Sequence, residues 1–451
     1  MDRSAAVNII GAGPTGTLLA LLLQRRGFKD IGVYESRPDP RASIAQAGRS
    51  INLALADRGI HALKVAGIFD ALDSVLLPMR GRLIHYQNKT TMFQPYGQRP
   101  NEVNYSVSRF RLNQALLQVA GRRPGIHFHF EHKFESANFT SGTAQIRDVR
   151  QNRQVTAQMQ PLLATDGAGS AVRRQMSQAG LIEATETDLE HGYKELSIPG
   201  SSGGFVMAPD SLHIWPRGNY MLIALPNENG SFTATLFLPK RGPVSFESLS
   251  DGTEVDRFMT QTFPDARELM PHCVEEFNTH PVGFLGNVSA SPWHHAGAAL
   301  LIGDAAHAMV PFHGQGMNCC FEDCIEFDAC VGRNSSWAAV FSEFTAARKA
   351  NTDAISVMAL ENYEEMRERV ADPKFQLQQM LSLELERRFP NRFIPRYSMV
   401  MFHHEIPYRI ALQRGAIQAD ILDLLTHGPS LLSDVDFVRA QREIDNRLSP
   451  L

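Results

Sequence analysis

The stretch VNIIGAGPTGTLLALLLQRRG, residues 7–27, decides the fold. Its apolar start, residues 7–10, predicts a buried strand, and residues 17–27 predict a helix that ends at Gly27. A second run, IGVYES at residues 31–36, predicts another strand. A strand, a helix and a strand within about 30 residues form a β-α-β unit, so we expect a parallel sheet.

The turn GAGPTG sets Gly11, Gly13 and Gly16 in G-x-G-x-x-G spacing. The first glycine permits a tight turn, the second lets a pyrophosphate approach the backbone, and the third lets the helix and strand pack closely. Glu35 ends the second strand, where a carboxylate accepts hydrogen bonds from a ribose. This pattern predicts a site for an adenosine dinucleotide, and an acceptor for a free 2′-hydroxyl fits FAD or NAD better than NADP.

The sequence holds one complete fingerprint of this kind. DGAGSAVR, residues 166–173, is partly similar but carries Val172 where the third glycine would stand. A second dinucleotide must therefore bind without a dedicated fold of its own.

A second glycine-rich stretch, GDAAHAMVPFHGQGMN at residues 303–318, follows the apolar run AGAALLI. A carboxylate at a strand end, here Asp304, can accept hydrogen bonds from the ribityl hydroxyls of a flavin. The turn GQGMN then begins a helix whose N–H groups and positive dipole end can face the pyrimidine edge of the isoalloxazine. This combination favours FAD.

The rest of the chain predicts a sheet and then helices. Residues 212–216, 219–226 and 231–239 alternate with turn signals and predict an antiparallel meander, whereas residues 338–350, 351–371 and 374–389 predict helices. We therefore expect an α/β fold: a Rossmann-like FAD-binding domain with an inserted antiparallel-sheet substrate domain and a C-terminal helical region. The expected boundaries are 1–75, 101–180 and 290–345 for the discontinuous FAD-binding domain, 76–100 and 181–289 for the substrate-binding sheet domain, and 346–451 for the helical region.

Composition narrows the class of protein. The 451 residues are 43% hydrophobic and 20% charged, which is typical of a globular chain with a real core. A net charge of −4 gives no electrostatic case for nucleic acid or an anionic membrane. No apolar run approaches the roughly 20 residues of a membrane span, and no signal peptide is evident, so we expect a cytoplasmic protein without a membrane anchor.

Three motifs in this order resemble the single-component aromatic hydroxylases that use FAD and NAD(P)H: GAGPTG, ATDGAGSAVR and LIGDAAHAMVPFHGQGMN. The stretches GRSINLALADRG (48–59), HGYKELSIP (191–199), ENYEEM (361–366) and RFIPRYSMV (392–400) are similar to the members that hydroxylate kynurenine. The resemblance covers nearly the whole chain. It departs at the C-terminus, where animal members carry a hydrophobic membrane tail, so a bacterial-type enzyme is expected, as a monomer or homodimer.

The resemblance implies a role for each matching residue. The residues that would hold FAD are Gly11, Gly13, Thr15, Gly16, Glu35, Arg37, Ala54, Arg109, Asp304, Gly316, Met317 and Asn318. Those beside the flavin ring would be Pro311, Phe312, His313, Gly314 and Gln315. Those for the substrate would be Arg82, Tyr96, Asn362, Glu365 and Tyr397. The implied reaction uses NADPH and O₂, proceeds through a flavin C4a-hydroperoxide, and converts L-kynurenine to 3-hydroxy-L-kynurenine without a catalytic acid or base.

The chemistry of kynurenine agrees with that set. It is a zwitterionic amino acid with an aminophenyl ketone, and its carboxylate suits the bidentate fork of an arginine. The alternative for Arg82 is an exposed arginine at a strand edge. For Asn362 and Glu365, which lie three residues apart, the alternative is a solvent-facing helix surface.

Other functions fit fewer features. CCFEDC at residues 319–324 has the cysteine spacing of flavin disulfide reductases, but those carry a second dinucleotide fingerprint. His127 and His129 share a strand face that could bind metal, yet no acidic or cysteine cluster completes a site, so no metal is expected. A non-enzymatic binding module such as a GDP-dissociation inhibitor would lack the late GD motif. A hydroxylase of a substituted kynurenine or another anthranilate-like ring, and the use of NADH, remain open alternatives.

Overall fold

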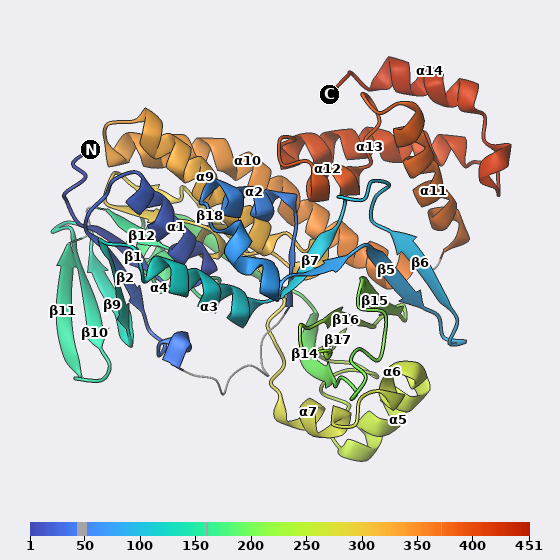
Figure 1. The fold of residues 1–451 in the computed structure, drawn as a ribbon, viewed down its shortest axis with the longest axis horizontal. Helices are drawn as coiled ribbons and strands as arrows, with labels where there is room; N and C mark the ends of the chain where they lie inside the picture. Colours follow the sequence, from blue (N-terminus) through green and yellow to red (C-terminus); the bar gives the residue numbers. More distant parts are fainter. Residues whose placement is uncertain (43–51, 159–160, 371) are drawn as a thin grey trace. The chain divides into compact units, whose positions relative to one another are not determined.

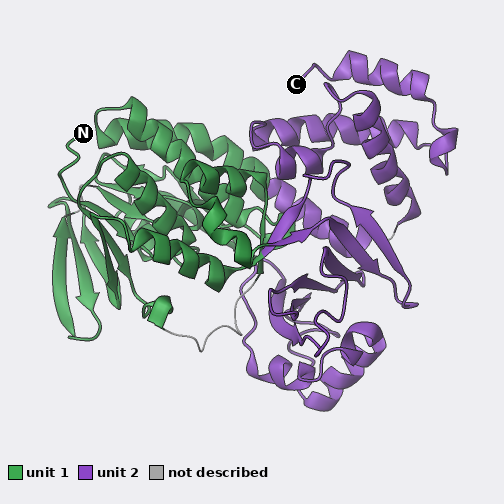
Figure 2. Cartoon of the chain, in the orientation of Figure 1, with its two compact units in different colours: residues 1–76, 107–188, 286–356 green, residues 77–106, 189–285, 357–451 purple. Residues whose placement is uncertain are grey.

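A computed structural model describes residues 1–42, 52–158, 161–370 and 372–451. Residues 48–51 of the quoted stretch 48–59, and residue 371 at the end of an expected helix, lie outside these ranges. The chain divides into two compact units, coloured separately in Figure 2. Unit 1 comprises residues 1–76, 107–188 and 286–356, and unit 2 comprises residues 77–106, 189–285 and 357–451. The three-part domain division expected from the sequence stays a prediction.

Unit 1 is built on a six-stranded sheet of order β19-β20-β12-β1-β2-β8. Its strands are β1 (Val7–Ile10), β2 (Ile31–Glu35), β8 (Ile126–Phe130), β12 (Leu162–Ala164), β19 (His294–His295) and β20 (Ala299–Leu301). Every pair is parallel except β19–β20. The β-α-β unit and the parallel sheet expected from the first stretch of sequence are therefore confirmed.

Helices cover this sheet, as the ribbon in Figure 1 shows. Helix α1 (Pro14–Arg25) joins β1 to β2 and contacts α3 (Arg109–Ala120) and α9 (Gly316–Arg333), while α2 (Asp57–Val65) also contacts α9. Helix α1 begins three residues earlier than expected, since Pro14 at the first helical turn has no N–H to satisfy there.

The remaining elements of unit 1 are short. An antiparallel sheet joins β9 (His132–Asn138), β10 (Thr143–Asp148) and β11 (Arg153–Gln158). Strands β13 (Glu183–Asp188) and β18 (Gly286–Ser291) pair as a ribbon, and two short helices follow strands of the main sheet, namely α4 (Ala171–Gln178) and α8 (Asp304–His307).

Unit 2 contains a second six-stranded sheet, of order β14-β17-β16-β15-β5-β6. Its strands are β5 (Gly81–His85), β6 (Thr91–Pro95), β14 (His191–Ile198), β15 (Ser211–Pro216), β16 (Met221–Pro226) and β17 (Phe232–Pro239). The expected meander is confirmed, because β15–β16 and β16–β17 are antiparallel. Strand β5 adds to it in parallel beside β15. Helices α5 (Gly252–Thr262), α6 (Pro264–Glu268) and α7 (Cys273–Thr279) contribute to a core around the buried Trp215.

The C-terminal part of unit 2 is helical. Helix α10 (Trp337–Glu364) is continuous where two segments were expected, passes from unit 1 into unit 2, and widens into a π-helical turn at Glu365–Arg369. Helices α11 (Pro373–Arg388), α12 (Arg396–Phe402), α13 (Tyr408–Leu425) and α14 (Phe437–Arg447) follow, and part of this group shares a core that includes Leu381, Leu385 and Ile421.

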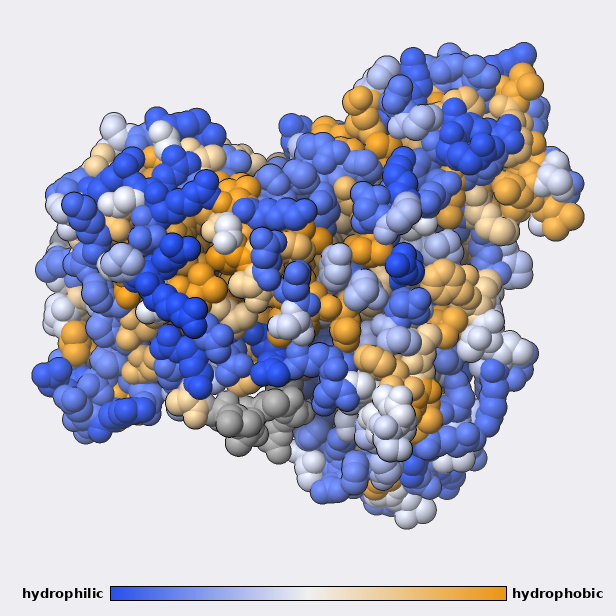
Figure 3. Space-filling view, viewed as in Figure 1, coloured by the Kyte–Doolittle hydropathy of each residue, from blue (hydrophilic) through white to orange (hydrophobic). Residues whose placement is uncertain are grey.

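Among the described residues, no helix has the length and apolar character that crossing a membrane requires. Hydrophilic residues are spread over the visible face of each unit, with hydrophobic ones interspersed (Figure 3).

The sheet of unit 2 also buries a chain of polar groups. His85 Nδ1 lies 2.9 Å from Asp265 Oδ2, and His85 Nε2 lies 2.9 Å from His213 Nδ1. Trp215 Nε1 donates to the same carboxylate oxygen at 2.8 Å, and His213 Nε2 lies 2.9 Å from the carbonyl oxygen of Ala208. Burial, only partly offset by that carbonyl, lowers the pKa of His213 to about 4.

This depressed pKa makes stability depend on pH. An unfolded histidine titrates near pH 6.5, so the contribution of neutral His213 is fully present above about 6.5 and is lost as the pH falls toward 4. Between pH 7 and 4.5 we expect the wild type to lose on the order of 2–3 kcal/mol of unfolding free energy more than His213→Gln, which cannot titrate. Urea unfolding at both pH values measures the difference. Equal losses in the two proteins would contradict the assignment.

Candidate functional site: a flavin cradle and a buried arginine cluster

The first turn of unit 1 requires glycine at its start. Gly11 follows β1 with φ of +103°, donates its N–H to the Tyr34 carbonyl at 2.7 Å, and has no room for a side chain. A Cβ there would lie 2.6 Å from the carbonyl oxygen of Thr165 on the neighbouring segment. The turn is therefore fixed by the close approach of two backbone segments.

The other two glycines of the fingerprint serve different purposes. A Cβ on Gly16 would lie 2.0 Å from the Gly11 carbonyl oxygen, so this glycine lets α1 pack against the strand. A Cβ on Gly13 would meet no protein atom within 4 Å, and Gly13, the residue before α1, provides no side-chain cap for that helix. There is thus open space at Gly13 beside the uncapped start of α1, which suits a pyrophosphate.

Helix α9 begins in the same way. No side chain caps it at Gln315, and a Cβ on Gly316 would likewise meet nothing within 4 Å. Two uncapped helix N-termini with open glycine positions therefore belong to one unit, and each can interact with a negatively charged part of a ligand.

Glu35 stands at the end of β2 with its side chain buried. One carboxylate oxygen accepts the N–H of Ala12 at 3.1 Å, and the other accepts the N–H and Nε of Arg37, each at 2.9 Å. Burial acts to raise the pKa of Glu35, but Arg37 and these N–H donors outweigh it and leave the pKa below its usual value. An ionised carboxylate keeps lone pairs free for ribose hydroxyls.

The strand-end aspartate follows a turn whose conformation favours glycine. Gly303 has φ of +65°, and the short helix α8 starts at Asp304, whose side chain is half-buried. Asp304 Oδ1 lies 3.5 Å from the Cys320 sulfur of α9. The predicted ribityl-binding carboxylate is thus set at the end of the parallel sheet, beside α9.

Asn318 of α9 ties together the segments around the predicted ring site. Its Oδ1 accepts the N–H of Ala56 at 2.9 Å, and its Nδ2 donates to the carbonyl oxygens of Ala54 and Gly314, each at 2.8 Å. The sequence predicted a direct flavin contact for Asn318. Because the side-chain amide is engaged by the protein, the backbone N–H of this residue is the group best suited to that contact.

The other predicted flavin residues belong to the same unit. Ala54 lies in β3 (Asn52–Leu55), Thr15 in the first turn of α1, Met317 in the first turn of α9, and Arg109 is exposed at the start of α3. Phe312, His313 and Gln315 are buried, in or just after the short helix Pro311–His313, and Gly314 takes φ of +65°. Their contacts with FAD stay predictions.

The middle motif forms a turn that caps a helix. Asp166 Oδ1 accepts the hydroxyl of Ser170 at 2.6 Å, and Oδ2 accepts the N–H of Ala171 at 2.7 Å, at the start of α4. Burial raises the pKa of Asp166 despite these bonds. The partial likeness of this stretch to a second fingerprint therefore corresponds to a capped helix end, not an open one.

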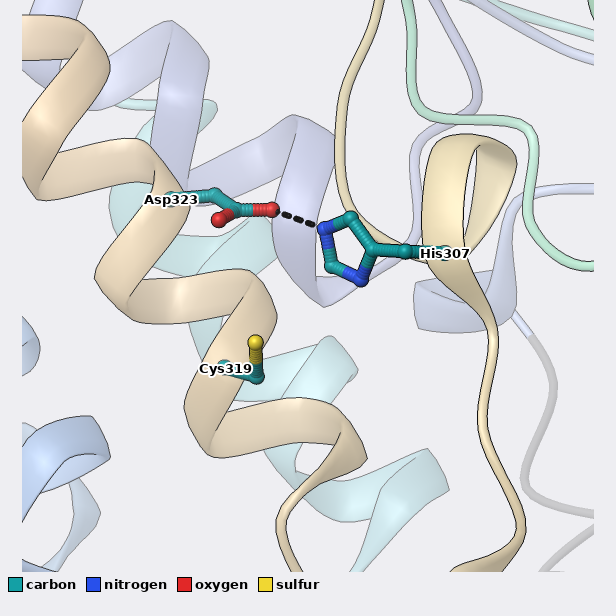
Figure 4. Close-up of side chains that lie close together, drawn as sticks. All are labelled: His307, Cys319 and Asp323. Carbon is teal, nitrogen blue, oxygen red and sulfur yellow. Dashed lines mark hydrogen bonds and ion pairs between the residues drawn. The ribbon is translucent and has the colours of Figure 1, made fainter. Parts of the chain in front are cut away.

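Figure 4 shows three buried side chains that could suggest a metal site: His307, Cys319 and Asp323. The positively charged Arg348 already occupies these ligands, because its Nε donates to Asp323 Oδ1 at 2.6 Å and its Nη2 lies 3.4 Å from the Cys319 sulfur. A metal cation is therefore disfavoured at this position. The second oxygen of Asp323 lies 2.6 Å from His307 Nε2. This group is therefore an ion-pair network.

The cysteines of α9 are not poised for redox chemistry. Cys319, Cys320 and Cys324 are buried and unpaired with one another, and burial raises their thiol pKa well above the ordinary value. Reactive cysteines are thiolates, so the disulfide-reductase interpretation loses its chemical basis. His129 stacks on Tyr34 at 4.8 Å, and its pKa is lowered chiefly by burial.

Unit 2 brings the predicted substrate residues together. Arg82 on β5 is only 6% exposed, so the alternative of an exposed strand-edge arginine is wrong. Its guanidinium carbon lies 5.0 Å from the centre of the Tyr397 ring, and Tyr397 stacks on Tyr96 at 5.5 Å. Burial opposes the charge, but Tyr397, Glu365 and Tyr96 raise the pKa of Arg82 above its usual value.

The guanidinium of Arg82 does not have all of its hydrogen bonds. Its Nη1 lies 3.3 Å from Glu365 Oε1, while its buried Nε has no hydrogen-bond partner among the described residues. Glu365 opens the π-helical turn after α10, and Asn362, 4% exposed, donates to the Met366 sulfur at 3.3 Å. The alternative of a solvent-facing surface for Asn362 is therefore also wrong.

Sequence reasoning missed two residues of these clusters. Asn104, 1% exposed, donates to the Tyr397 hydroxyl at 3.4 Å, and its Oδ1 is buried without a partner among the described residues. No sequence signal marked it. Asp323 could have been suspected, because an Asp within the apolar helical run CCFEDCIEF predicts a buried charge with a partner.

FAD fits the residues of unit 1. The space at Gly13, the uncapped starts of α1 and α9, and the carboxylates of Glu35 and Asp304 match its pyrophosphate, pyrimidine edge, ribose and ribityl chain.

Comparisons with known proteins agree. A family model described as an FAD binding domain matches residues 4–328. The chain is 46% identical over 447 residues to a kynurenine 3-monooxygenase of Xanthomonas axonopodis pv. citri, spanning 99% of this chain and 98% of the relative. It is 42% identical over 449 residues to a kynurenine 3-monooxygenase of Myxococcus xanthus, spanning 99% and 96%.

Solved structures share the fold. A 2-methyl-3-hydroxypyridine-5-carboxylic acid oxygenase superposes with a TM-score of 0.66 at 17% identity, covering 84% of this chain and 96% of that one. Pseudomonas aeruginosa PqsL in complex with 2-aminobenzoylacetate gives a TM-score of 0.64 at 16% identity, covering 81% and 97%. The expected fold class is thereby confirmed.

These findings define a flavoprotein monooxygenase: the chain belongs to the FAD-binding domain family, with FAD as its cofactor. Within that family it belongs with the kynurenine 3-monooxygenases. The family resemblance and the FAD expected from the sequence are both confirmed.

The two glycines of the first turn give a matched test. Gly13→Ala should leave the fold intact, because its φ of −70° suits alanine and no protein atom is near, but should weaken FAD binding by about ten-fold or more through a clash with the pyrophosphate. Gly16→Ala should instead destabilise unit 1 by on the order of 2 kcal/mol. Fluorescence titration with FAD and thermal unfolding separate the two. Normal FAD affinity in Gly13→Ala would show that the pyrophosphate lies elsewhere.

Proposed function

We propose that this chain hydroxylates L-kynurenine to 3-hydroxy-L-kynurenine, with bound FAD, NADPH and O₂. The observation that carries the choice of substrate is the buried Arg82 of unit 2, whose guanidinium is only partly paired. The names of the relatives support the same choice.

Arg82 suits the substrate carboxylate. A buried guanidinium is stable only when its donors are satisfied, and here the Nη1–carboxylate contact of 3.3 Å and the side chains of Tyr96 and Tyr397 leave Nε without a partner among the described residues. A carboxylate that accepts from two of its N–H groups would supply the missing bonds.

The phenols beside Arg82 add donors. The pKa of Tyr96 is raised well above its usual value, and that of Tyr397 is also raised, in both cases chiefly by burial. Both hydroxyls therefore stay protonated at neutral pH and can donate hydrogen bonds. The carboxylate of Glu365, which is paired with Arg82, can accept a hydrogen bond from the α-ammonium group of the substrate. A bound zwitterion would therefore replace the Arg82–Glu365 ion pair with two, one from its carboxylate to Arg82 and one from its ammonium group to Glu365.

An apolar cluster adjoins this polar group. Tyr96 and Leu225 pack with the partly buried Leu212, Ile223 and Phe402. A ligand with a charged amino acid head and an aromatic body matches such an arrangement better than a wholly polar or wholly apolar ligand does.

Bound FAD, once reduced by NADPH, would activate O₂, so that one oxygen atom enters the product as the new hydroxyl group and the other leaves as water. The chain's own contribution is to hold the cofactor through the starts of α1 and α9 and to orient the amino acid head. Because the sequence holds a single dinucleotide fingerprint, NADPH is a transient co-substrate.

The test is a substrate screen with the purified holoenzyme. L-kynurenine should accelerate NADPH oxidation and give one hydroxylated product per NADPH, whereas a ketone that lacks the amino acid head should not. A methylated kynurenine or anthranilate used better than L-kynurenine would favour the alternatives. NADPH oxidation that yields only hydrogen peroxide with L-kynurenine would refute the proposal, and NADH in a parallel assay tests the choice of reductant.

Arg82→Met should weaken L-kynurenine binding by about 10–100-fold while FAD content stays normal. Methionine keeps much of the stem, so the lost fork is the main change. Following flavin absorbance during L-kynurenine titration measures the affinity.

Arg80→Met is the matched control, because Arg80 is exposed and lies two residues before Arg82. It should bind L-kynurenine like the wild type. If Arg82→Met also binds normally, the carboxylate must bind elsewhere.

A further inference from the structure

Asp323 occupies a position in unit 1 that neither the motifs nor the proposed reaction explains. It lies on α9, is 0% exposed, and its carboxylate meets three donors, two from residues 303–307 and one from α10. Oδ2 accepts the N–H of Gly303 at 3.1 Å and lies 2.6 Å from His307 Nε2, while Oδ1 accepts Arg348 Nε at 2.6 Å (Figure 4 shows the contact with His307).

Two of these donors bracket the flavin-binding aspartate. Gly303 is the residue before α8 and His307 is its last residue, so one oxygen of Asp323 holds both ends of the four-residue helix that begins with Asp304. Such a short helix has little stability of its own, and no side chain caps it at Gly303. By holding both ends of α8, Asp323 thus fixes the direction of the Asp304 side chain.

The backbone at this point needs such a constraint. Gly303 takes φ of +65° and ψ of −141°, which an L side chain rarely adopts. A Cβ there would lie 3.0 Å from the Cys320 sulfur, one turn of α9 before Asp323. The turn is therefore pressed against α9, and the carboxylate supplies its hydrogen bond.

The carboxylate itself is fixed from the other side. Arg348 of α10, 4% exposed, binds Asp323 and also Glu322 Oε2 at 2.6 Å, and Glu322 in turn pairs with the buried Arg58 of α2. Although burial acts to raise it, the pKa of Asp323 lies below its ordinary value because His307 and Arg348 stabilise the charge. A charged, rigidly held acceptor results.

We propose that Asp323 is a positioning residue for FAD: it touches no part of the cofactor but aims Asp304 at the ribityl chain through Gly303 and His307. This inference rests on the proposed role of Asp304. A merely structural role would lower stability alone, whereas a positioning role couples Asp323 to Asp304 in FAD affinity.

The experiment is a double-mutant cycle read out by dissociation of FAD from diluted holoenzyme, followed by flavin fluorescence. Asp304→Ala and Asp323→Asn should each weaken FAD binding by about ten-fold. The double variant should bind FAD no more weakly than Asp304→Ala alone, because Asp323 can no longer orient a carboxylate at position 304.

Asp328→Asn is the matched control. Asp328 also lies on α9 and also makes a two-point ion pair with an arginine, Arg26, but among the described residues it makes no hydrogen bond or ion pair with α8. Asp328→Asn should bind FAD with wild-type affinity even if the variant is less stable than the wild type. An equal loss of FAD affinity in Asp328→Asn and Asp323→Asn would overturn the proposal, since it would trace the effect to a general weakening of α9.

The outcomes separate this proposal from the one it rests on. Asp304→Ala with wild-type FAD affinity would remove the role of Asp304 and the inference with it. Additive losses in the double variant would leave the role of Asp304 standing and overturn the inference alone. If Asp323→Asn fails to fold, His307→Leu takes its place, because it releases one end of α8 and leaves the Asp323–Arg348 pair in place. The same non-additivity with Asp304→Ala is then expected, and additivity would refute the proposal.

Discussion

The side-chain amide of Asn318 is the contact on which the cofactor-facing part of unit 1 depends. It bonds the N–H of Ala56 and the carbonyl oxygens of Ala54 and Gly314, and so joins two segments more than 250 residues apart in sequence to the first turn of α9. Each buried backbone group left without its partner would cost about 1–3 kcal/mol. No other residue type of this size offers one acceptor and two donors on one rigid plane. The open space at Gly316 is available to a ligand because this amide holds the turn around it in place.

Further along α9, ion pairs take over from these neutral hydrogen bonds. Glu322 and Asp323 follow Asn318 by about one turn of α9, and they bind Arg58, Arg348 and His307 from α2, α10 and α8. Buried ion pairs are weak evidence for stability, because desolvation offsets much of their attraction. Their geometry is specific, however, and a carboxylate between an arginine and an imidazole admits few arrangements. The N-terminal half of α9 therefore holds the turn at Gly314, the turn at Gly303 and the start of α2 together.

What the sequence could predict follows the range of the interactions. The glycine turn after β1 was predictable because its constraint lies within a few residues and in the two strands beside it. The start of α1 at Pro14 was not, since the apolar period begins only after Thr17, whereas the earlier start comes from Pro14 in the first helical turn. Asp323 and Arg348 lie 25 residues apart on two helices, so no local sequence spacing predicts that they pair. The π-helical turn at Glu365–Arg369 has no periodic signature, and the burial of Arg82 depends on β5 joining β15 from a distant part of the chain.

The fold alone cannot choose the substrate, because a 2-methyl-3-hydroxypyridine-5-carboxylic acid oxygenase shares it at 17% identity, as does PqsL, solved with 2-aminobenzoylacetate, at 16%. Selection must then come from side chains such as those around Arg82. A guanidinium buried at 6% exposure, with its Nε unpartnered among the described residues, is unfavourable until a ligand completes its bonds. If that ligand is the amino acid head, an aromatic ketone without a carboxylate would desolvate the site and leave the same donors unsatisfied. Sites built to bond a polar group reject analogues that lack it far more strongly than apolar pockets reject a missing methylene. If Arg82 binds the amino acid head as proposed, that head sets the discrimination between substrates more than the fit of the ring does.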